Sequence, residues 1–285
     1  MRVFIVGATG VIGRTLVPQL VGQGDEVVAL VRSKERAAII DLPDVEVIEG
    51  DLLTIEPSEL TSILRGCDAA AHMATALRAD SPGLGTTNTN EALRTTGTRK
   101  LIDAALEAGI GMYVQQGIAL SYVDGGDNWL DESTPFFVAD PAVTPPHVAM
   151  EAMVREVDSN RMRWQILRGG SFVGPDTFQG RTIARLRSGE EHILGDGMNW
   201  VSYIHADDYA DAVALALHSD ASGELLNINA EPIHQGEYLE GLASRLGLPA
   251  PVREPEATRP RSYRNSTDRA RSVLGWQPFH SIWPG

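Results

Sequence analysis

Residues 1–13 read MRVFIVGATGVIG, an apolar run that leads directly into three glycines spaced three residues apart. The run Val3–Val6 is typical of a buried parallel strand. After such a strand, Gly7 permits a tight turn, Gly10 lets the backbone approach a pyrophosphate, and Gly13 lets a helix pack closely on the strand. The free N–H groups at the helix start then face the anion. The stretch therefore predicts a strand, a dinucleotide-binding loop and a helix.

The same alternation of strand and helix continues through the first two thirds of the chain. Further strands are expected at Val27–Val31, Val45–Ile48, Ala69–His72, Met112–Val114 and Trp164–Leu167, with helices at 11–21, 59–64, 91–108 and 147–157. This pattern predicts the α/β class with a doubly wound parallel sheet. The rhythm becomes irregular after residue 168. We expect a dinucleotide-binding lobe at 1–168 and a smaller mixed C-terminal substrate lobe at 169–285, with about 203–230 returning to the sheet.

Composition excludes several classes of partner. The 285 residues carry a formal net charge of -14, which repels nucleic-acid phosphates and anionic lipid. No apolar span reaches transmembrane length, and Gly7 interrupts the N-terminal apolar run too early for a signal peptide. The single cysteine, Cys67, cannot form an internal disulfide or a cysteine metal cluster. We expect a cytoplasmic protein that binds a small-molecule substrate, without nucleic-acid or membrane partners.

The end of the second strand distinguishes between the two nicotinamide cofactors. An NAD site usually has Asp or Glu there to hold the ribose 2′-OH. This chain reads ALVRSKER at 29–36, with Val31 in the acidic place and Arg32, Lys34 and Arg36 after it. A solvated basic loop would give the same pattern. Basic residues at this point favour a 2′-phosphate, so we expect NADP(H).

Further along, the sequence resembles the extended and atypical short-chain dehydrogenase/reductases, the group that contains nucleotide-sugar epimerases and dehydratases. The resemblance rests on GATGVIG, Gly50-Asp51-Leu52, AAHMATA at 70–76, DESTP at 131–135, ILRGGSFVGP at 166–175 and SYIHADDYADAVALAL at 202–217. It implies a Rossmann-type fold, a small carbonyl or sugar-like substrate, and a homodimer as one state that the chain can form. We call Arg32 and Lys34 the basic pair. The expected cofactor contacts are this pair and the residues that the resemblance implies, namely Gly7, Thr9, Gly10, Val11, Ile12, Gly13, Asp51, Leu52, Met73, Ala74, Thr75, Gln116, Gly117 and Gly170.

The catalytic motif of that family is missing here. Its Tyr-x-x-x-Lys falls on the segment from His147 to Glu151, and its serine falls within Gln115–Ile118, where no hydroxyl exists. Counting back from Gly97-Thr98, Arg94 takes the place of the family's asparagine. The family's proton transfer from tyrosine therefore cannot operate unchanged.

Three hypotheses remain for the chemistry. In the first, His147 donates the proton of an NADP(H)-dependent reductase, because Glu151 one helical turn away raises its pKa. In the second, the protein is a catalytically silent NADP sensor, as the NmrA-like regulators of this superfamily are. In the third, the two residues carry out non-redox isomerase, lyase or cyclase chemistry. An exposed helix pair without function would show the same spacing. We also expect the loop 77–90 to contact substrate, because it follows a strand on the cofactor side.

A metal site is not predicted. His205 precedes Asp207 and Asp208, which are typical of a helix start. The sequence offers no evident third ligand close to them.

Overall fold

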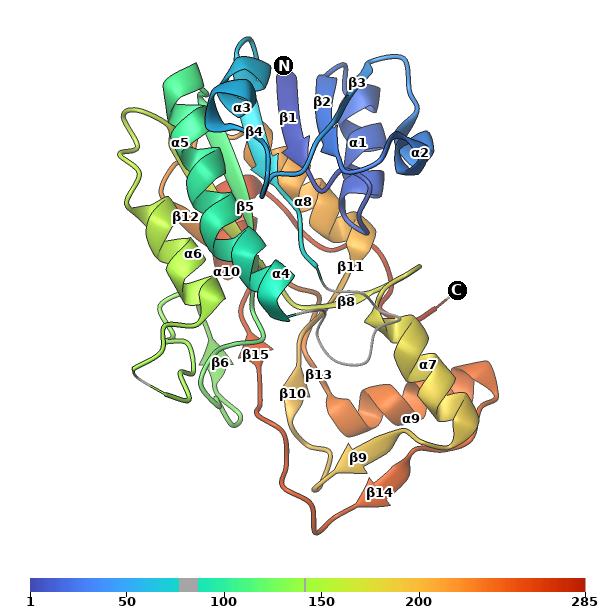
Figure 1. The fold of residues 1–285 in the computed structure, drawn as a ribbon. Coiled ribbons are helices and arrows are strands. Elements are labelled where there is room, and N and C mark those ends of the chain that lie inside the picture. Colours follow the sequence, from blue (N-terminus) through green and yellow to red (C-terminus); the bar gives the residue numbers. More distant parts are fainter. Residues whose placement is uncertain (77–86, 141, 285) are drawn as a thin grey trace. The chain divides into compact units, whose positions relative to one another are not determined.

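The computed structural model describes residues 1–76, 87–140 and 142–284 of the chain. Figure 1 shows a central sheet of seven strands in the order β12-β7-β5-β4-β1-β2-β3. Their bounds are β1 Arg2–Val6, β2 Glu26–Val31, β3 Val45–Glu49, β4 Ala69–His72, β5 Met112–Ile118, β7 Arg163–Gly169 and β12 Glu224–Ile228. The expected doubly wound α/β fold is confirmed.

Strand order reverses at β1, which pairs in parallel with both β2 and β4. Val6 lies opposite Leu30 on one side and His72 on the other. Ligands of doubly wound sheets bind beyond the carboxyl ends of the strands at such a reversal. The glycine loop follows β1 directly, so the fold places it at this point.

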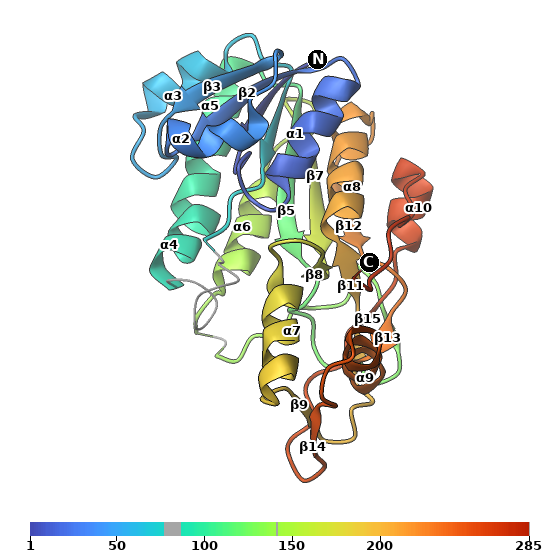
Figure 2. The same ribbon diagram turned by 90° about the vertical axis from the view of Figure 1, so that its right-hand side faces the viewer.

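Helices cover both faces of the sheet. Figure 2 shows α1 and α8 on one face and α3, α5 and α6 on the other. Their bounds are α1 Gly13–Gly22, α3 Pro57–Leu64, α5 Thr98–Ala108, α6 Pro146–Arg155 and α8 Ala206–His218, and a short helix α2, Lys34–Ala37, follows β2. Proline begins both α3 and α6, where its missing N–H removes no helical hydrogen bond. The apolar sides of α3, α5 and α6 pack on a core whose large side chains include Phe4, Leu60, Leu101, Tyr113 and Ile166.

The helix expected at 91–108 is not one regular helix. It consists of α4 (Thr87–Ala92), a π-helical turn η2 (Leu93–Gly97), and α5. The Thr98 hydroxyl donates to the carbonyl of Leu93 at 3.3 Å and helps to hold the wide turn. Turns of this kind occur frequently at functional sites. Here the turn contains Arg94, whose side chain is buried.

The chain packs as two compact units, each built from several segments of the sequence. The first unit contains 1–117, 138–168 and 210–226, and the second contains 118–137, 169–209 and 227–285. Thus 118–137, expected in the first lobe, belongs to the second. The second unit contains β6 Trp129–Leu130, β8 Ser171–Val173, α7 Phe178–Ser188, β9 His192–Leu194, β10 Trp200–Val201, β11 Tyr203–His205, β13 Ile233–His234, α9 Gln235–Leu246, β14 Val252–Glu254, β15 Arg264–Asn265 and α10 Asp268–Leu274.

Aromatic side chains form the core of the second unit. The ring of Tyr238 stacks on Tyr203 at 3.9 Å and on Trp283 at 5.1 Å between centroids. Gln179 donates to the Tyr238 hydroxyl at 2.8 Å and to the carbonyl of Ile282 at 2.9 Å. The last residues of the described chain are therefore fixed to this core. Within the described residues, no helix has both the length and the apolar character needed to cross a membrane.

Candidate cofactor loop and active-site cluster

The three loop positions require glycine for different structural reasons. Gly7 has a φ of +91°, and a Cβ on it would lie 2.6 Å from the backbone nitrogen of Ala74. A Cβ on Gly13 would lie 2.2 Å from the carbonyl oxygen of Gly7, so the helix could not pack as it does. Gly10 is exposed, and the nearest atom to a Cβ there is the Gly7 oxygen at 3.2 Å. Only Gly10 therefore lacks a strong packing reason, which fits a place kept open for a ligand.

The loop turns directly into the first helix. The N–H of Gly10 donates to the Gly7 carbonyl at 3.0 Å, and the N–H of Arg14 donates to the Gly10 carbonyl at 3.0 Å. Ile12 is buried, whereas Thr9 and Val11 are half-buried. The backbone geometry agrees with an anion-binding helix start.

The end of β2 presents the basic pair to solvent. Val31 is buried, and Arg32 and Lys34 are both exposed. Within the described part of the chain, neither has an ion-pair partner, so both charges are available to an anionic group. The exposed basic side chains are compatible with a 2′-phosphate at this point.

The next expected cofactor residues lie at the ends of β3 and β4. Leu52 is 2% exposed and packs in the core, which leaves almost none of its side chain open to a ligand. Asp51 accepts the N–H of Leu53 at 2.9 Å. Met73 is buried, and its N–H donates to the Val6 carbonyl at 2.8 Å. The β4 end thus lies beside the glycine loop.

The segment after β4 is held by the following helix. Ala74 and Thr75 are half-buried. The N–H of Ala76 donates to the Asn90 side-chain oxygen at 3.1 Å. The part of the expected substrate loop at 77–86 lies outside the described residues.

At the end of β5, amide side chains stand where the family's serine would be. Gln115 accepts the Tyr113 hydroxyl at 2.7 Å, and Gln116 is buried. A Cβ on Gly117 would lie 3.2 Å from Cγ of Arg168. Gly170 lies in the second unit, where a Cβ would meet the Ser202 carbonyl oxygen at 2.2 Å. Packing alone explains both glycines.

The most important correction concerns Glu151. Its two carboxylate oxygens accept from Arg168 on β7, Oε1 from Nε at 2.9 Å and Oε2 from Nη2 at 2.6 Å. Both side chains are about 5% exposed. Glu151 is therefore neither a surface residue nor a carboxylate reserved for His147, because a buried guanidinium holds both of its oxygens.

The expectation that Glu151 raises the pKa of His147 was wrong. Burial is the largest cause of its lowered pKa, and the guanidinium groups of Arg94 and Arg168 lower the pKa further, to about 4. The prediction assumed that Glu151 would raise the pKa, but Arg168 neutralises that carboxylate. At pH 7 the imidazole is uncharged. We call this group the arginine cluster; it consists of His147, Glu151, Arg168 and Arg94.

Sequence reasoning overlooked Arg168. The available signal was a charged residue at the end of the apolar run of β7, because a buried arginine requires a buried acid. A fully buried histidine lies at the end of β4. Burial, with a smaller contribution from Arg94, lowers the pKa of His72 to about 4.

A doubly wound sheet with this glycine loop at its reversal point defines a dinucleotide-binding Rossmann protein. Residues 3–229 match the NAD dependent epimerase/dehydratase family. The chain belongs to this family, and the expected family is confirmed. The family description supports a nicotinamide dinucleotide as the cofactor.

Named relatives span nearly the whole chain. A 3-diazoavenalumate denitrifying reductase from a Streptomyces species is 34% identical over 99% of this chain and 98% of its own. A dTDP-6-deoxy-L-talose 4-dehydrogenase (NAD(P)(+)) from Kitasatospora kifunensis is 28% identical over 99% and 92%. The solved dTDP-glucose 4,6-dehydratase from Streptomyces venezuelae has a TM-score of 0.80 at 24% identity, covering 99% of this chain and 93% of that one. The chain is thus an oxidoreductase-like or epimerase-like enzyme, as expected.

Proposed function

We propose that the protein is an NADP(H)-dependent reductase whose substrate accepts hydride without a proton from a tyrosine. The glycine loop would hold the pyrophosphate, and Arg32 and Lys34 would hold the 2′-phosphate of NADP(H). When bound, the reduced nicotinamide supplies the hydride. The solved dehydratase in the comparison contains NAD, so the preference for NADP(H) rests on the exposed basic pair.

The single observation that carries the proposal is the uncharged His147 in the place of the family's tyrosine. With a pKa of about 4, the imidazole is almost entirely neutral at neutral pH, and its remaining N–H is a very weak acid. Glu151 is bound to Arg168, and the end of β5 offers amides instead of a hydroxyl. The groups that would protonate a carbonyl oxygen in the family are thus replaced by groups that are poor proton donors.

An aromatic diazonium group, the cationic form of a diazo substituent, is a hydride acceptor that needs no such proton. When hydride replaces the nitrogen of a diazonium carbon, a C–H bond forms and the C–N bond breaks, and its electron pair leaves with N2. No oxygen atom receives a proton in this step. The Streptomyces relative, named a denitrifying reductase of a diazo compound, supports this class of substrate. We therefore infer a diazo-bearing small molecule in preference to a sugar or simple carbonyl.

Isotope transfer tests the substrate class directly. NADPH carrying deuterium at its transferable position is mixed with an aromatic diazo carboxylic acid, and N2, NADP and deuterated product are measured. We expect all three in equal amounts, with deuterium on the carbon that carried nitrogen. Gly10→Val, with a blocked cofactor loop, measures the uncatalysed reduction. Equal rates in the parent and Gly10→Val would refute the diazo proposal.

The two earlier alternatives give other results in the same assay. Turnover of aldehydes, ketones or nucleotide sugars instead would return the protein to carbonyl chemistry. Tight NADPH binding with no turnover of either class would identify a sensor. A rate that falls above about pH 6.5 in the parent, and no longer does so in His147→Phe, would restore His147 as the proton donor.

A further inference from the structure

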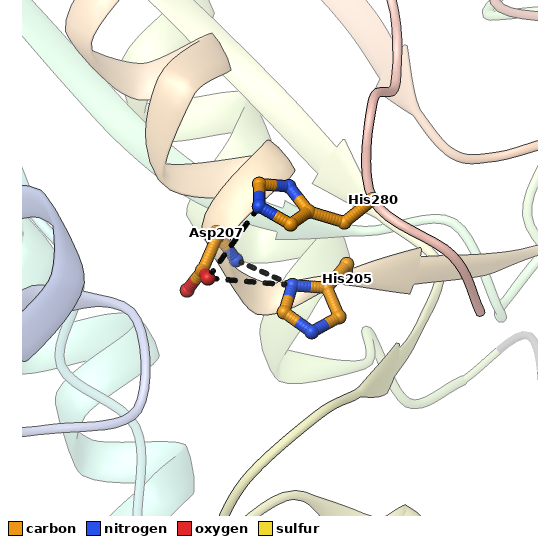
Figure 3. A group of neighbouring side chains, drawn as sticks. All are labelled: His205, Asp207 and His280. Carbon is orange, nitrogen blue, oxygen red and sulfur yellow. Dashed lines mark hydrogen bonds and ion pairs between the residues drawn. The ribbon is translucent and has the colours of Figure 1, made fainter. Parts of the chain in front are cut away.

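A group of side chains in the second unit brings together residues that are distant in the sequence. β11 ends at His205 and α8 begins at Ala206, so Asp207 and Asp208 lie in the first turn of that helix. His280 comes from the C-terminal segment after α10. Figure 3 shows both imidazole rings directed at the Asp207 carboxylate. We call His205, Asp207 and His280 the His–Asp cluster.

The ligand atoms of this cluster lie close to the spacing that a metal ion requires. His205 Nδ1 is 3.7 Å and His280 Nε2 is 3.9 Å from the same oxygen, Oδ2 of Asp207. The candidate ligand atoms all lie within 4.8 Å of one another. Tetrahedral zinc, with bonds of about 2.0–2.1 Å, places its ligand atoms roughly 3.4 Å apart. Each nitrogen is a few tenths of an ångström too far from the carboxylate oxygen, and the widest spacing in the cluster exceeds the zinc value by about 1.4 Å, so the two rings must move together when an ion binds.

Asp208 orients the ring of His280. Its buried carboxylate accepts the backbone N–H of His280 at 3.0 and 3.2 Å, and accepts Nδ1 of the ring at 2.6 Å. Because the carboxylate only accepts, Nδ1 carries the proton and the lone pair is on Nε2, the atom that faces Asp207. A histidine that donates its other N–H to a carboxylate is the usual arrangement behind a metal ligand.

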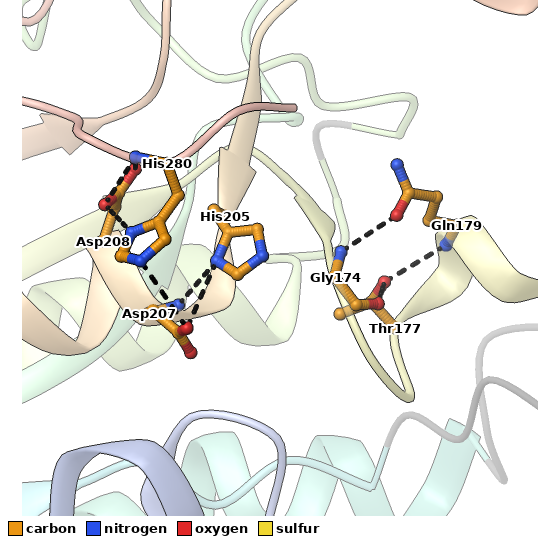
Figure 4. Close-up of polar contacts among 7 residues, drawn as sticks. All are labelled: Gly174, Thr177, Gln179, His205, Asp207, Asp208 and His280. Carbon is orange, nitrogen blue, oxygen red and sulfur yellow. Dashed lines mark hydrogen bonds and ion pairs between the residues drawn. The ribbon is translucent and has the colours of Figure 1, made fainter. Parts of the chain in front are cut away.

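The ring of His205 is also fixed in place. Its Nδ1 accepts the backbone N–H of Asp207 at 3.3 Å through its one lone pair, so a metal ion at this atom would replace that long hydrogen bond. Its other edge lies against Gly174, which has a φ of +108°, and a Cβ there would lie 2.8 Å from Nε2. Figure 4 shows His205 between the loop at Gly174 and the two aspartates. A side chain at 174 would force the ring to move.

We propose that His205, Asp207 and His280 bind one divalent transition-metal ion, with zinc as the preferred ion, and that Asp208 positions His280. Two imidazole nitrogens and one carboxylate oxygen suit zinc, whereas Mg²⁺ and Ca²⁺ prefer oxygen ligands. Three protein ligands leave a fourth position for water. The proposal does not depend on the reductase proposal, because every residue that it uses lies in the second unit.

Metal titration of the full chain tests the site. Protein freed of metal with a chelator is titrated with Zn²⁺ against a chromophoric indicator, and with Co²⁺ to record its tetrahedral absorption bands. We expect one Zn²⁺ per chain, and no competition by Mg²⁺ or Ca²⁺ at equal concentration. Zinc affinity should fall about 10–100-fold in Asp208→Asn, and further in Asp207→Asn and His205→Gln.

The matched control is another histidine–carboxylate pair of the same unit. His192 Nδ1 lies 2.6 Å from Glu254 Oε1, so His192→Gln removes an imidazole that also contacts a carboxylate. Its zinc affinity should equal that of the parent. Because Asp207 is a partly exposed side chain, Asp207→Asn should fold, and circular dichroism verifies this. The absence of stoichiometric zinc binding in the parent, or unchanged affinity in both Asp207→Asn and His205→Gln, would overturn the proposal.

Discussion

Removing one partner of the Glu151–Arg168 pair should destabilise the protein far more than removing both. Two short hydrogen bonds join side chains that are about 5% exposed, so neither charge has access to water. Glu151→Gln leaves the guanidinium buried without a countercharge, and Arg168→Met does the same to the carboxylate. Each should lower the free energy of unfolding by about 3–5 kcal/mol. The double variant replaces the pair by uncharged groups and should lose much less.

Urea unfolding at pH 7 of the parent, both single variants and the double variant measures these values. An exposed pair provides the control: Arg99 Nη2 lies 3.1 Å from Glu156 Oε2, and Arg99→Met should cost less than about 1 kcal/mol. We expect the double variant to be at least about 3 kcal/mol more stable than the sum of the two single losses implies. Additive losses would refute the pairing, and single losses as small as the control would refute its burial.

The same variants test the electrostatics at His147. Arg168→Met removes one of the charges that lower its pKa and releases the Glu151 carboxylate. The pKa should then rise from about 4 by about 1–3, measured by NMR titration of the ring. An unchanged value would mean that burial alone determines it.

Three further outcomes follow from the geometry. Gly10→Val should abolish cofactor binding yet keep the parent melting temperature, whereas Gly13→Val should lower that temperature, because its side chain would collide with the carbonyl of Gly7. Calorimetry measures the melting temperature and the cofactor affinity of both variants. Normal affinity in Gly10→Val would mean that the loop is not the pyrophosphate site. Arg32→Ala should weaken NADPH binding by about 1.5–3 kcal/mol and leave NADH binding unchanged; equal losses for the two cofactors would contradict the 2′-phosphate assignment. Because the pKa of His147 in the folded state lies below its unfolded value of 6.5, the folded state binds fewer protons than the unfolded state. The contribution of His147 to stability is therefore complete above about pH 6.5 and is lost as the pH falls toward 4. Urea midpoints over this range should decline less steeply in His147→Phe.

Sequence patterns predicted the sheet well because its strands are buried on both faces and read as continuous apolar runs. Val3–Val6 and Ala69–His72 match β1 and β4 to within one residue. The glycine spacing also predicted the loop, because the loop, the turn and the helix follow one another directly in the chain. Elements that are determined by one short segment could thus be predicted from the sequence.

The chemistry of the candidate site depends on contacts between segments, and there the sequence was misleading. Glu151 and His147 are one helical turn apart, and this spacing predicted a dyad. In the structure, the guanidinium of Arg168, which is distant in the sequence, donates to Glu151 instead, because both charges are buried. His280 reaches the helix start at Asp208 from the far end of the chain. Spacing along one helix cannot show which buried charge a carboxylate neutralises.

The π-helical turn at Leu93–Gly97 has a consequence for how the helix around it tolerates a change in length. A π turn contains one residue more than an α turn, so it absorbs that residue and leaves the helix on either side at nearly the angle of a regular helix. Deleting Thr96 would make the helix regular while α4 kept its angle to α5, so Asn90 would still accept the N–H of Ala76. The deletion would instead change the wide turn itself, which holds the buried Arg94. The extra residue thus acts on the surroundings of Arg94 and leaves the hold on the chain after β4 in place.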